Sequence, residues 1–362
     1  MNNMKRFLLF LLIGILLFTV SSCGKDNYHF ITLKYDFYLN TTSYVYLEYN
    51  SKDTKKEDII KDVDNDIKNI LIRMENQFSP SKDSTLKNLN QNKELICDDE
   101  FIDVLNKSIE ISNNYSVFDV SIGALTNIWN ISNQAEYCYI NDSCVKPSDD
   151  DIKEAIKAVD FNKIIIDGNK VTIPSNMLLD FGAIIKGYAA NLIKEYLMNK
   201  GYDFFIINLG GNIYLNGTYH VQDGNEVNIS LEDPYNLDNN LGTITVNNTS
   251  IVTSNIVKRY IEIDNIKYHH IIDKYTGYPV DNDLIQTTII NPDSMLADIY
   301  STTTLILGLD GAVNLMSERN LDGILITKDK TIYIIINNDE YDDNIFHKYT
   351  NLDEYKTIIK RK

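Results

Sequence analysis

Residues Leu178–Gly211 read LLDFGAIIKGYAANLIKEYLMNKGYDFFIINLGG, and this stretch decides the fold. After Asp180 and a glycine turn, apolar residues recur at helical spacing until Gly201, which ends the predicted helix. The apolar run 204–209 then predicts a buried strand that ends on paired glycines. A helix start beside Lys186 offers N–H groups and a cation to a phosphate, and the paired glycines let a ligand approach the backbone. A helix–strand unit that uses its glycines only as caps explains the pattern equally well.

The first residues indicate export from the cytoplasm. Basic residues precede the apolar run 7–20, which is too short to span a membrane and typical of a signal-peptide core. The following Val-Ser-Ser-Cys23 resembles a bacterial lipobox, which predicts cleavage before Cys23 and acylation of that cysteine. We therefore expect a lipoprotein signal peptide at 1–22, a tether at 23–36, and a lipid anchor in the cell membrane that faces the extracytoplasmic side. An ordinary secretory leader with a coincidental cysteine is the alternative.

Cysteine usage and charge limit the remaining possibilities. Cys138 and Cys144 share a polar segment and can form a disulfide outside the cytoplasm, whereas nothing marks Cys97 as reactive. The 362 residues carry a formal net charge of −17, which disfavours binding to nucleic acid and to anionic lipid. A polyanionic ligand would need a local lysine or a bridging cation.

Helical and strand patterns are mixed along the chain, which predicts an α+β fold. Helices are expected at 57–77, 99–113, 150–159, 294–307 and 311–319, and strands at 44–49, 163–166, 170–173, 323–327 and 331–335, with strands dominant between 211 and 290. The segment 78–90 reads as a loop. Since no long linker interrupts the chain, we expect a single domain at 37–337 with two lobes, followed by a polar and partly mobile tail at 338–362.

Two pairs of residues have spacings that suit catalysis. Asp298 and Thr302 lie four residues apart in a predicted helix and project from one face, where their oxygens would suit Mg²⁺ or Ca²⁺. His269 and His270 lie in a strand-like segment, and a histidine can accept a proton near neutral pH. Because side chains alternate across a strand, only one histidine would face a site, and the other should tolerate replacement better. Either pair can also be purely structural.

A third segment, VFDVSIGALTNIW at 117–129, contains the only tryptophan of the chain. Phe118 and Asp119 on a tight turn would suit an aromatic ligand. Capping of the helix that follows explains Asp119 and Ser121 nearly as well.

Taken in order, these segments resemble the ApbE family of FAD:protein FMN transferases. The chain reads FSPSKDSTLKNLN, FDVSIGALTNIW, LDFGAIIKGYAA with NLGG, VNISLEDP, TSN, HIIDKYTGYP and ADIYST. The family patterns run, loosely, S-x-Y…S-x-x-x-x-L-N, F-D-x-T-x-G-x-L-x-x-x-W, D-L-G-x-I-x-K-G-Y-A…G-G, W-x-V-x-I-x-D-P, T-S-G, H-I-I-D-P-x-T-G-x-P and A-D-A-x-x-T. The similarity spans about 39–325 and implies one ApbE-like domain of mixed sheets flanked by helices, with two lobes around a flavin cleft.

The resemblance also implies a reaction and the residues that perform it. FMN would pass from FAD to a threonine hydroxyl of an acceptor flavoprotein as a phosphoester, with release of AMP. Acceptors of the family are usually subunits of membrane redox complexes or extracellular flavoproteins. The implied FAD contacts are Phe78, Val117, Phe118, Asp119, Asp180, Lys186 and Ile272. The implied Mg²⁺ ligands are Asp298, Thr302 and the carbonyl of Ala183, and His270 matches the histidine proposed to assist the acceptor hydroxyl.

Four departures from the family pattern leave these ligands and the histidine in place. Phe78 replaces a tyrosine but would keep a stacking face, and Leu39 stands near the usual methionine. Asn255 replaces a glycine, and asparagine is the residue that best substitutes for glycine in a left-handed backbone. Lys274 replaces a proline. Two other functions stay open. With water as acceptor the protein would be a Mg²⁺-dependent FAD pyrophosphatase that yields FMN and AMP, and without catalysis it would be an exported flavin-binding lipoprotein.

Overall fold

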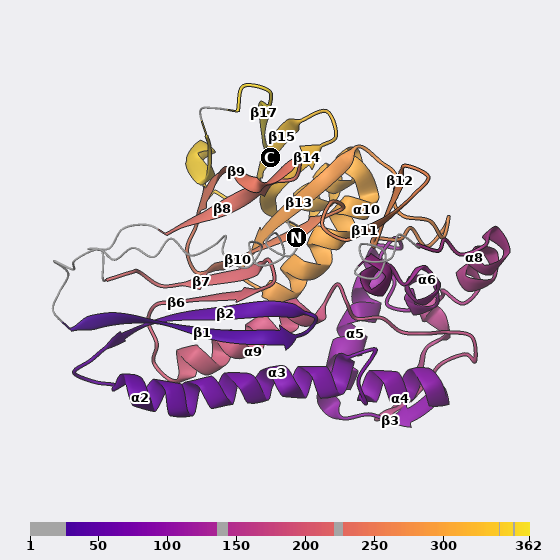
Figure 1. The fold of residues 1–362 in the computed structure, drawn as a ribbon, viewed down its shortest axis with the longest axis horizontal. Coiled ribbons are helices and arrows are strands. Elements are labelled where there is room, and N and C mark those ends of the chain that lie inside the picture. Colours follow the sequence, from indigo (N-terminus) through magenta and orange to yellow (C-terminus); the bar gives the residue numbers. More distant parts are fainter. Residues whose placement is uncertain (1–26, 136–143, 221–226, 340, 350–351) are drawn as a thin grey trace, which may run out of the picture.

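A nine-stranded sheet crosses the protein in the order β1-β2-β6-β7-β10-β13-β14-β15-β17 (Figure 1). The computed structural model describes residues 27–135, 144–220, 227–339, 341–349 and 352–362. All neighbouring strands of this sheet are antiparallel except β15 and β17, which are parallel. The strands are β1 (Tyr28–Tyr38), β2 (Thr41–Asn50), β6 (Phe205–Leu209), β7 (Asn212–Asn216), β10 (Thr249–Asn255), β13 (Leu284–Asn291), β14 (Asp322–Thr327), β15 (Thr331–Ile336) and β17 (Lys356–Arg361).

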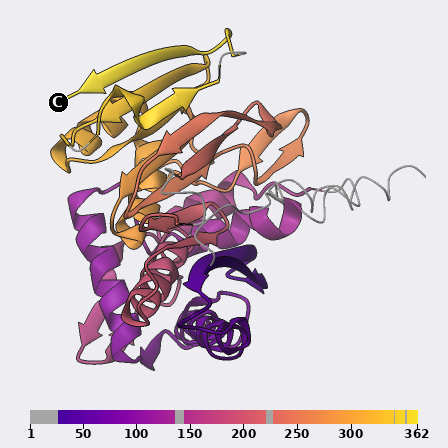
Figure 2. The same cartoon turned by 90° about the vertical axis from the view of Figure 1, so that its left-hand side faces the viewer.

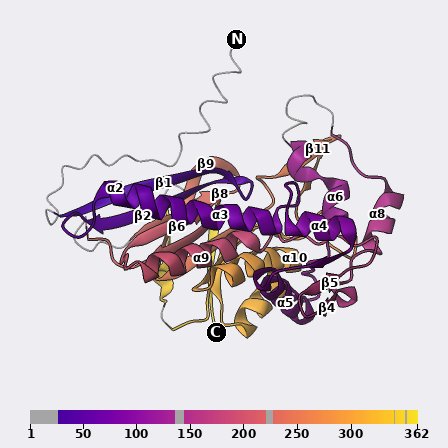
Figure 3. The same ribbon diagram turned by 90° about the horizontal axis from the view of Figure 1, so that it is seen from below.

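Helices pack against this sheet and make the fold α+β, as predicted. α3 (Asp64–Phe78) lies beside α9 (Ile185–Asn199), which packs on β6 and β7 (Figure 3). α10 (Ser294–Glu318) packs on β10 and β13 and against α9. The other helices named here are α2 (Lys56–Asp58), α4 (Thr85–Asn92), α5 (Asp99–Asn114), α6 (Gly123–Trp129) and α8 (Asp149–Ile156), with a π-helical turn at Ile59–Val63.

Three small sheets surround the large one. Their strands are β3 (Glu94–Ile96), β5 (Lys170–Thr172) and β4 (Ile165–Asp167), then β16 (Phe346–Lys348), β9 (Asn236–Thr245) and β8 (Asn228–Asp233), then β11 (Tyr260–Ile263) and β12 (Ile266–His269). Apolar residues of β8, β9 and β16 form one core cluster with alternate residues of β14 and β15, while the residues between them join the main core. β14 and β15 are therefore buried on both faces, which explains their nearly continuous apolar sequences.

The segment that decides the fold forms the predicted helix and strand. α9 ends at Asn199, and β6 ends at a turn where Gly210 and Gly211 have φ values of 64° and 95°. A Cβ atom at Gly210 would lie 2.2 Å from the hydroxyl oxygen of Thr41, so this turn packs directly under the β1–β2 hairpin. The two glycines are thus needed for backbone conformation and close packing.

Two helix predictions differ from the structure. Part of the expected loop 78–90 is the start of α4, because Ser84 caps a helix by accepting a 3.0 Å hydrogen bond from the backbone N–H of Lys87. The two helices expected at 294–307 and 311–319 are the halves of α10, which breaks at Gly308 with φ 72° and ψ 178°. Asp283 accepts the backbone N–H of Leu309 and stabilises that break.

Both ends of the predicted domain extend further than expected. β1 begins at Tyr28 and pairs with β2, so most of the expected tether 23–36 belongs to the sheet. The expected tail 338–362 contributes β16 and β17, and Tyr355 is buried with its hydroxyl bonded to Asp233. The segment 338–362 is mostly polar, so its sequence does not indicate that its few apolar residues pack in the core. Figure 2 shows these C-terminal strands, in yellow, at the opposite end of the molecule from the indigo β1–β2 pair.

Several predictions about the N-terminus and the cysteines concern residues that the structure does not describe. The leader 1–22, Cys23 and Cys138 are not among the described residues. Cys144 is disulfide-bonded, and Cys97 is a buried free thiol. Burial raises the pKa of Cys97 to about 11, so the thiol is unreactive near neutral pH. Within the described ranges, no helix has the length and apolar character needed to cross a membrane.

Candidate active site

One large cavity gathers the residues that were expected to act on a ligand. Its volume is about 1490 Å³, and residues of α3, α6, α9, α10, β8 and β10 contribute to its wall. The predicted residues that line it are Phe78, Val117, Phe118, Asp119, Asp180, Ala183, Lys186, His270, Ile272, Asp298 and Thr302. Segments that lie far apart in the sequence therefore line one cavity, as expected if their motifs form a single site.

Asp298 is fixed where α9 and α10 meet. Its Oδ2 atom accepts a 2.9 Å hydrogen bond from the backbone N–H of Gly187. A Cβ atom at Gly187 would lie 2.2 Å from the backbone oxygen of Ser294, so a larger residue would push the helices apart. Thr302 follows one helical turn after Asp298, and both line the cavity as their spacing predicts.

The oxygen atoms at this helix junction fit a hard divalent cation. The carboxylate of Asp298, the hydroxyl of Thr302 and the carbonyl of Ala183 are all oxygen donors on one cavity. Among the described residues, no group of three or more His, Cys, Asp or Glu side chains is placed to hold a metal. A site with one carboxylate, which leaves positions for water and for a ligand, suits Mg²⁺ better than Zn²⁺.

His270 follows β12 and is anchored through one ring nitrogen. Its Nδ1 atom lies 3.2 Å from the carbonyl oxygen of Arg259, and because a carbonyl only accepts, Nδ1 carries the proton. Nε2 therefore keeps a free lone pair on a residue that lines the cavity. Burial, together with the positive charge of Arg259, lowers the pKa of His270 to about 3. The imidazole is neutral at physiological pH and can accept a proton.

His269 is buried on the other side of β12, which confirms that only one histidine faces the cavity. Its Nε2–H donates to the carbonyl of Val280 at 2.8 Å, and its Nδ1 accepts the backbone N–H of Ile271 at 3.3 Å. These bonds give His269 a structural role, so its replacement should lower stability, and its greater tolerance relative to His270 stays a prediction. Removing the ring would leave two backbone groups without partners in the interior.

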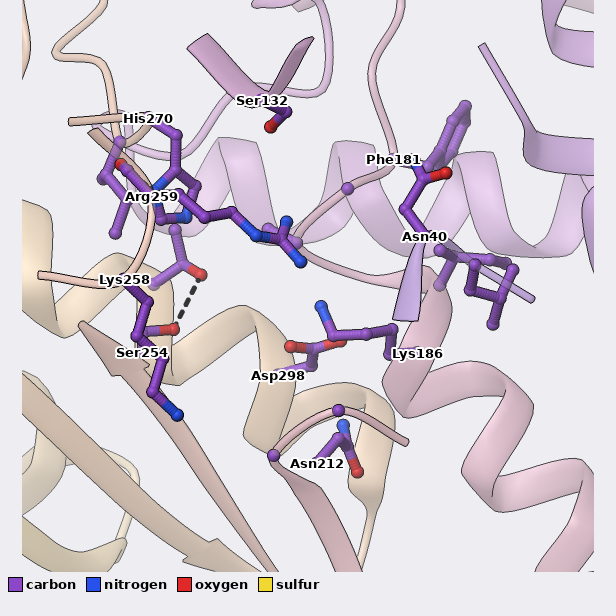
Figure 4. Close-up of a pocket in the computed structure, with 18 of the residues that line it drawn as sticks. Asn40, Ser132, Phe181, Lys186, Asn212, Ser254, Lys258, Arg259, His270 and Asp298 are labelled. Atoms are coloured by element: carbon purple, nitrogen blue, oxygen red, sulfur yellow. Dashed lines mark hydrogen bonds between the residues drawn. The ribbon is translucent and has the colours of Figure 1, made fainter. Parts of the chain in front are cut away.

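Two cations at the cavity have no counter-charge among the residues that the structure describes. Figure 4 shows Lys186 and Arg259 around the same space as Asp298. Within the described residues neither has an ion pair or side-chain hydrogen bond, whereas the neighbouring Lys258 pairs with Glu232. Arg259 was missed from the sequence because no motif includes it. The adjacent Lys258 did not distinguish it, because neighbouring basic residues occur elsewhere in the chain.

Asn212 is a second residue that the sequence did not mark. Both polar atoms of its side chain are buried and have no hydrogen-bond partner in the described protein, and the residue lines the cavity. It directly follows the Gly210–Gly211 turn in the sequence, and Figure 4 shows it near Asp298 and Lys186. A buried amide without partners costs about 1–3 kcal/mol. The side-chain amide of Asn212 is therefore available for hydrogen bonds to a polar ligand in the cavity or to water bound with that ligand.

The carboxylate of Asp119 is not free to bind a ligand. Its Oδ2 atom pairs with Nζ of Lys274 at 2.8 Å, and its Oδ1 atom accepts from the backbone and hydroxyl of Ser121 at 2.9 and 2.6 Å. The carboxylate is fully buried and the Lys274 side chain is 12% exposed. Only the backbone of Asp119 can contact a ligand. Lys274, where the family has proline, ties the loop after β12 to the turn before α6.

Two other predictions about this region need correction, and Trp129 has a structural role. Phe78 is only 3% exposed, which leaves little of its ring for stacking on a ligand. The ring stacks on Phe101 with 5.2 Å between the ring centroids and makes a T-shaped contact with Phe181. Asn255 does not adopt a left-handed backbone, and its side chain instead accepts the backbone N–H groups of residues 257 and 258. Trp129 is a core residue whose Nε1–H donates to the carbonyl of Gly277 at 2.7 Å.

Asp180 also has a structural task. Its Oδ1 atom accepts the backbone N–H of Gly182 at 2.7 Å, and its Oδ2 atom accepts the hydroxyl of Thr126 at 2.7 Å. These bonds shape the turn that leads into α9 and tie it to α6. Its half-buried carboxylate still lines the cavity.

The sequence matches the ApbE family over residues 39–325. The chain belongs to the ApbE family. A FAD:protein FMN transferase from Klebsiella pneumoniae is 32% identical over 224 residues, which are 60% of this chain and 66% of that protein. A protein of the same name from Treponema pallidum is 31% identical over 231 residues, which are 59% and 62% of the two chains. The chain thus matches slightly less than two thirds of the length of these two relatives.

Solved ApbE structures share the fold. The flavin transferase ApbE from Vibrio cholerae has a TM-score of 0.72 and 21% identity, and the match covers 89% of this chain and 97% of that one. The ApbE protein from Thermotoga maritima has a TM-score of 0.73 and 22% identity, with coverage of 84% and 96%. The single α+β domain predicted from the sequence is confirmed.

The buried ion pair allows a test of the role of Lys274. Asp119→Ala should lower the free energy of unfolding by about 3–5 kcal/mol, because it leaves the Lys274 ammonium unpaired in the interior. Adding Lys274→Met should recover most of this loss. Urea unfolding followed by circular dichroism measures both changes. Asp150→Ala removes the exposed pair with Lys153 and should change stability by less than about 1 kcal/mol. A double variant as unstable as Asp119→Ala would contradict the pairing.

Proposed function

We propose that this protein transfers FMN from FAD to a threonine hydroxyl of an acceptor flavoprotein, forming a phosphoester and releasing AMP in a Mg²⁺-dependent reaction. The observation that carries this proposal is the shared cavity of His270, Lys186 and the oxygen donors around Asp298. A neutral base, a cation and a hard-metal site are what transfer from a pyrophosphate to a hydroxyl requires. The names of the relatives support the same chemistry.

Charge neutralisation is the first requirement of this reaction. The protein carries a formal net charge of −17 and would repel the pyrophosphate dianion of FAD. Lys186 and Arg259, which have no ion pair within the described residues, would attract it locally. Bound at Asp298, Thr302 and the Ala183 carbonyl, Mg²⁺ would neutralise charge on the phosphates. Phe118 and Ile272 provide apolar wall for the rings, and we infer that the cleft separates two lobes around the flavin.

His270 would perform the proton transfer. Its Nε2 lone pair takes the proton of the threonine hydroxyl while that oxygen forms a bond to the phosphorus of the FMN half. The bond from this phosphorus to the bridging oxygen breaks, and the electron pair leaves with AMP. The Nδ1–H contact with the Arg259 carbonyl holds the ring in the tautomer that this step needs.

Incubating the purified protein with FAD, Mg²⁺ and a candidate acceptor flavoprotein tests the assignment directly. A mass increase of the acceptor equal to FMN less one water, with one AMP released, is the expected result. AMP release without a modified acceptor would establish the pyrophosphatase instead. Flavin binding without AMP release would leave only a flavin-binding lipoprotein.

Asp298→Ala should abolish transfer, because the carboxylate would hold a cation at the helix junction. It also leaves the N–H of Gly187 without its partner, which should cost about 1–3 kcal/mol of stability without unfolding the protein. FMN transfer across a Mg²⁺ titration measures the loss, and circular dichroism checks folding. Asp310→Ala is the matched control, since Asp310 is exposed on the same helix. Full transfer by Asp298→Ala at trace Mg²⁺ would refute the metal assignment.

His270→Ala should reduce transfer by about 10²–10⁴-fold with little change in FAD affinity. Because the pKa of His270 is lowered to about 3, its base form persists far into acid. Protonation should reduce kcat/KM only as the pH falls towards this value, so kcat/KM should stay flat between about pH 5 and 7 apart from other groups. A fall of kcat/KM at acid pH with its midpoint near the ordinary histidine pKa would contradict the low pKa, if that fall is absent from the pH profile of His270→Gln.

We also propose that Cys23 anchors the protein to the outer face of the cell membrane. Only residues 24–27 separate this cysteine from the start of β1. Cys23→Ala should move the protein from the membrane fraction to the soluble extracytoplasmic fraction, as measured by fractionation and immunoblotting. Cys97→Ala, which removes a buried thiol, is the control that should stay at the membrane. Retention of Cys23→Ala after cleavage of its leader would exclude lipid anchoring at this residue.

A further inference from the structure

We propose that Ser254 is a positioning residue for the metal site, because it ends a directed chain of hydroxyl groups that aims the lone pairs of Thr302 into the cavity. The inference rests on the proposed Mg²⁺-dependent function. Ser254 lies in β10 and lines the same cavity as Asp298 and Thr302. Figure 4 shows Ser254 and Asp298 on neighbouring parts of the cavity wall.

The direction of the chain follows from its last link. Ser301 donates its only hydroxyl proton to the carbonyl oxygen of Asp298 at 2.9 Å. The contact of 2.7 Å between the hydroxyls of Ser254 and Ser301 must therefore use the proton of Ser254. The contact of 3.2 Å between Ser254 and Thr302 must then use the proton of Thr302. Each hydroxyl donates once, so no other assignment satisfies all three contacts.

The next two threonines of α10 show what Thr302 would otherwise do. Thr303 donates its hydroxyl proton to the carbonyl of Ile299 at 2.7 Å, and Thr304 donates to that of Tyr300 at 2.8 Å. Such bonds to the carbonyl four residues earlier are the common choice of threonine in a helix. Thr302 is the one of the three whose proton is directed to another element.

This arrangement suits a metal ligand. A hydroxyl binds a cation through a lone pair, so its proton needs an acceptor on the side away from the ion. Ser254 supplies that acceptor, and the carbonyl of Asp298 ends the chain on the residue that provides the carboxylate. The metal ligands Asp298 and Thr302 are thus coupled through two serines. Partners that orient metal ligands in this way typically change metal affinity by about 10–100-fold when removed.

Replacing Ser254 with Ala removes this acceptor. The Thr302 hydroxyl is then free to donate to the Asp298 carbonyl, as Thr303 and Thr304 donate to theirs, which turns its lone pairs from the cavity. We expect Ser254→Ala to weaken metal binding about 10–100-fold while the unfolding midpoint stays near that of the wild type. Ser254→Thr keeps a hydroxyl and should restore binding. Ser301→Ala removes the next link and should have a smaller effect.

The experiment titrates Mn²⁺ into the metal-free mature protein and follows the free ion by electron paramagnetic resonance, since Mn²⁺ shares the oxygen preference of Mg²⁺. The Mg²⁺ concentration for half-maximal FMN transfer provides a second measurement. Thr303→Val is the matched control, because it removes a hydroxyl from the adjacent position without touching the chain. It should bind Mn²⁺ like the wild type.

The outcomes separate this inference from the proposed function. If Asp298→Ala loses Mn²⁺ binding while Ser254→Ala keeps wild-type affinity, the metal site stands and the positioning role of Ser254 is wrong. Failure of a folded Ser254→Thr to recover affinity would also overturn it, because packing rather than the hydroxyl would then matter. A wild-type protein that binds neither Mn²⁺ nor Mg²⁺ would overturn both proposals.

Discussion

The close approach of α9 and α10 is the constraint on which the rest of the site depends. The N–H of Gly187 reaches the carboxylate of Asp298 only because the glycine lacks a side chain that would collide with the backbone of Ser294. The contact fixes α10, which carries Asp298 and Thr302, against the start of α9. Ala183 lies in the turn before α9, and Lys186 lies in its first helical turn. A substitution at Gly187 would therefore disturb the packing of α9 and α10 together with Lys186 and the proposed metal ligands that they position.

The electrostatics of the cavity oppose those of the whole molecule. A net charge of −17 keeps polyanions away, yet Lys186 and Arg259 have no ion pair within the described residues. Positive charge is thus left available where the proposed substrate carries its phosphates, while Lys274 is neutralised by Asp119 in a buried pair. Lys186 and Lys274 therefore have different tasks. Lys186 supplies charge at the cavity, whereas Lys274 has a structural role in its pair with the buried carboxylate of Asp119.

Much of the fold was predictable because local signals and tertiary packing agree. The helix and strand after Asp180, the shared face of Asp298 and Thr302, and the opposite orientations of the two adjacent histidines all follow from periodicity. The sequence could not reveal features that depend on distant partners. The pairing of Asp119 with Lys274 and the packing of Phe78 against its aromatic neighbours became visible only in three dimensions. The same is true of the two cavity cations that lack an ion pair within the described part of the chain. The polar C-terminal segment was misjudged for the same reason, since its few apolar residues have partners only in the assembled core.

The low pKa of His270 limits what this residue can contribute to the proposed reaction. Burial and the charge of Arg259 keep its imidazole neutral, but they also make it a weak base. Proton abstraction is then most useful late in the reaction, when the threonine oxygen has begun to bond to phosphorus and its proton has become acidic. An approaching pyrophosphate would oppose the effect of Arg259 and strengthen the base only when substrate is present. Most of the rate enhancement of the proposed reaction must therefore come from charge neutralisation at the phosphates. The helix junction around Asp298 then contributes more to the rate than His270 does.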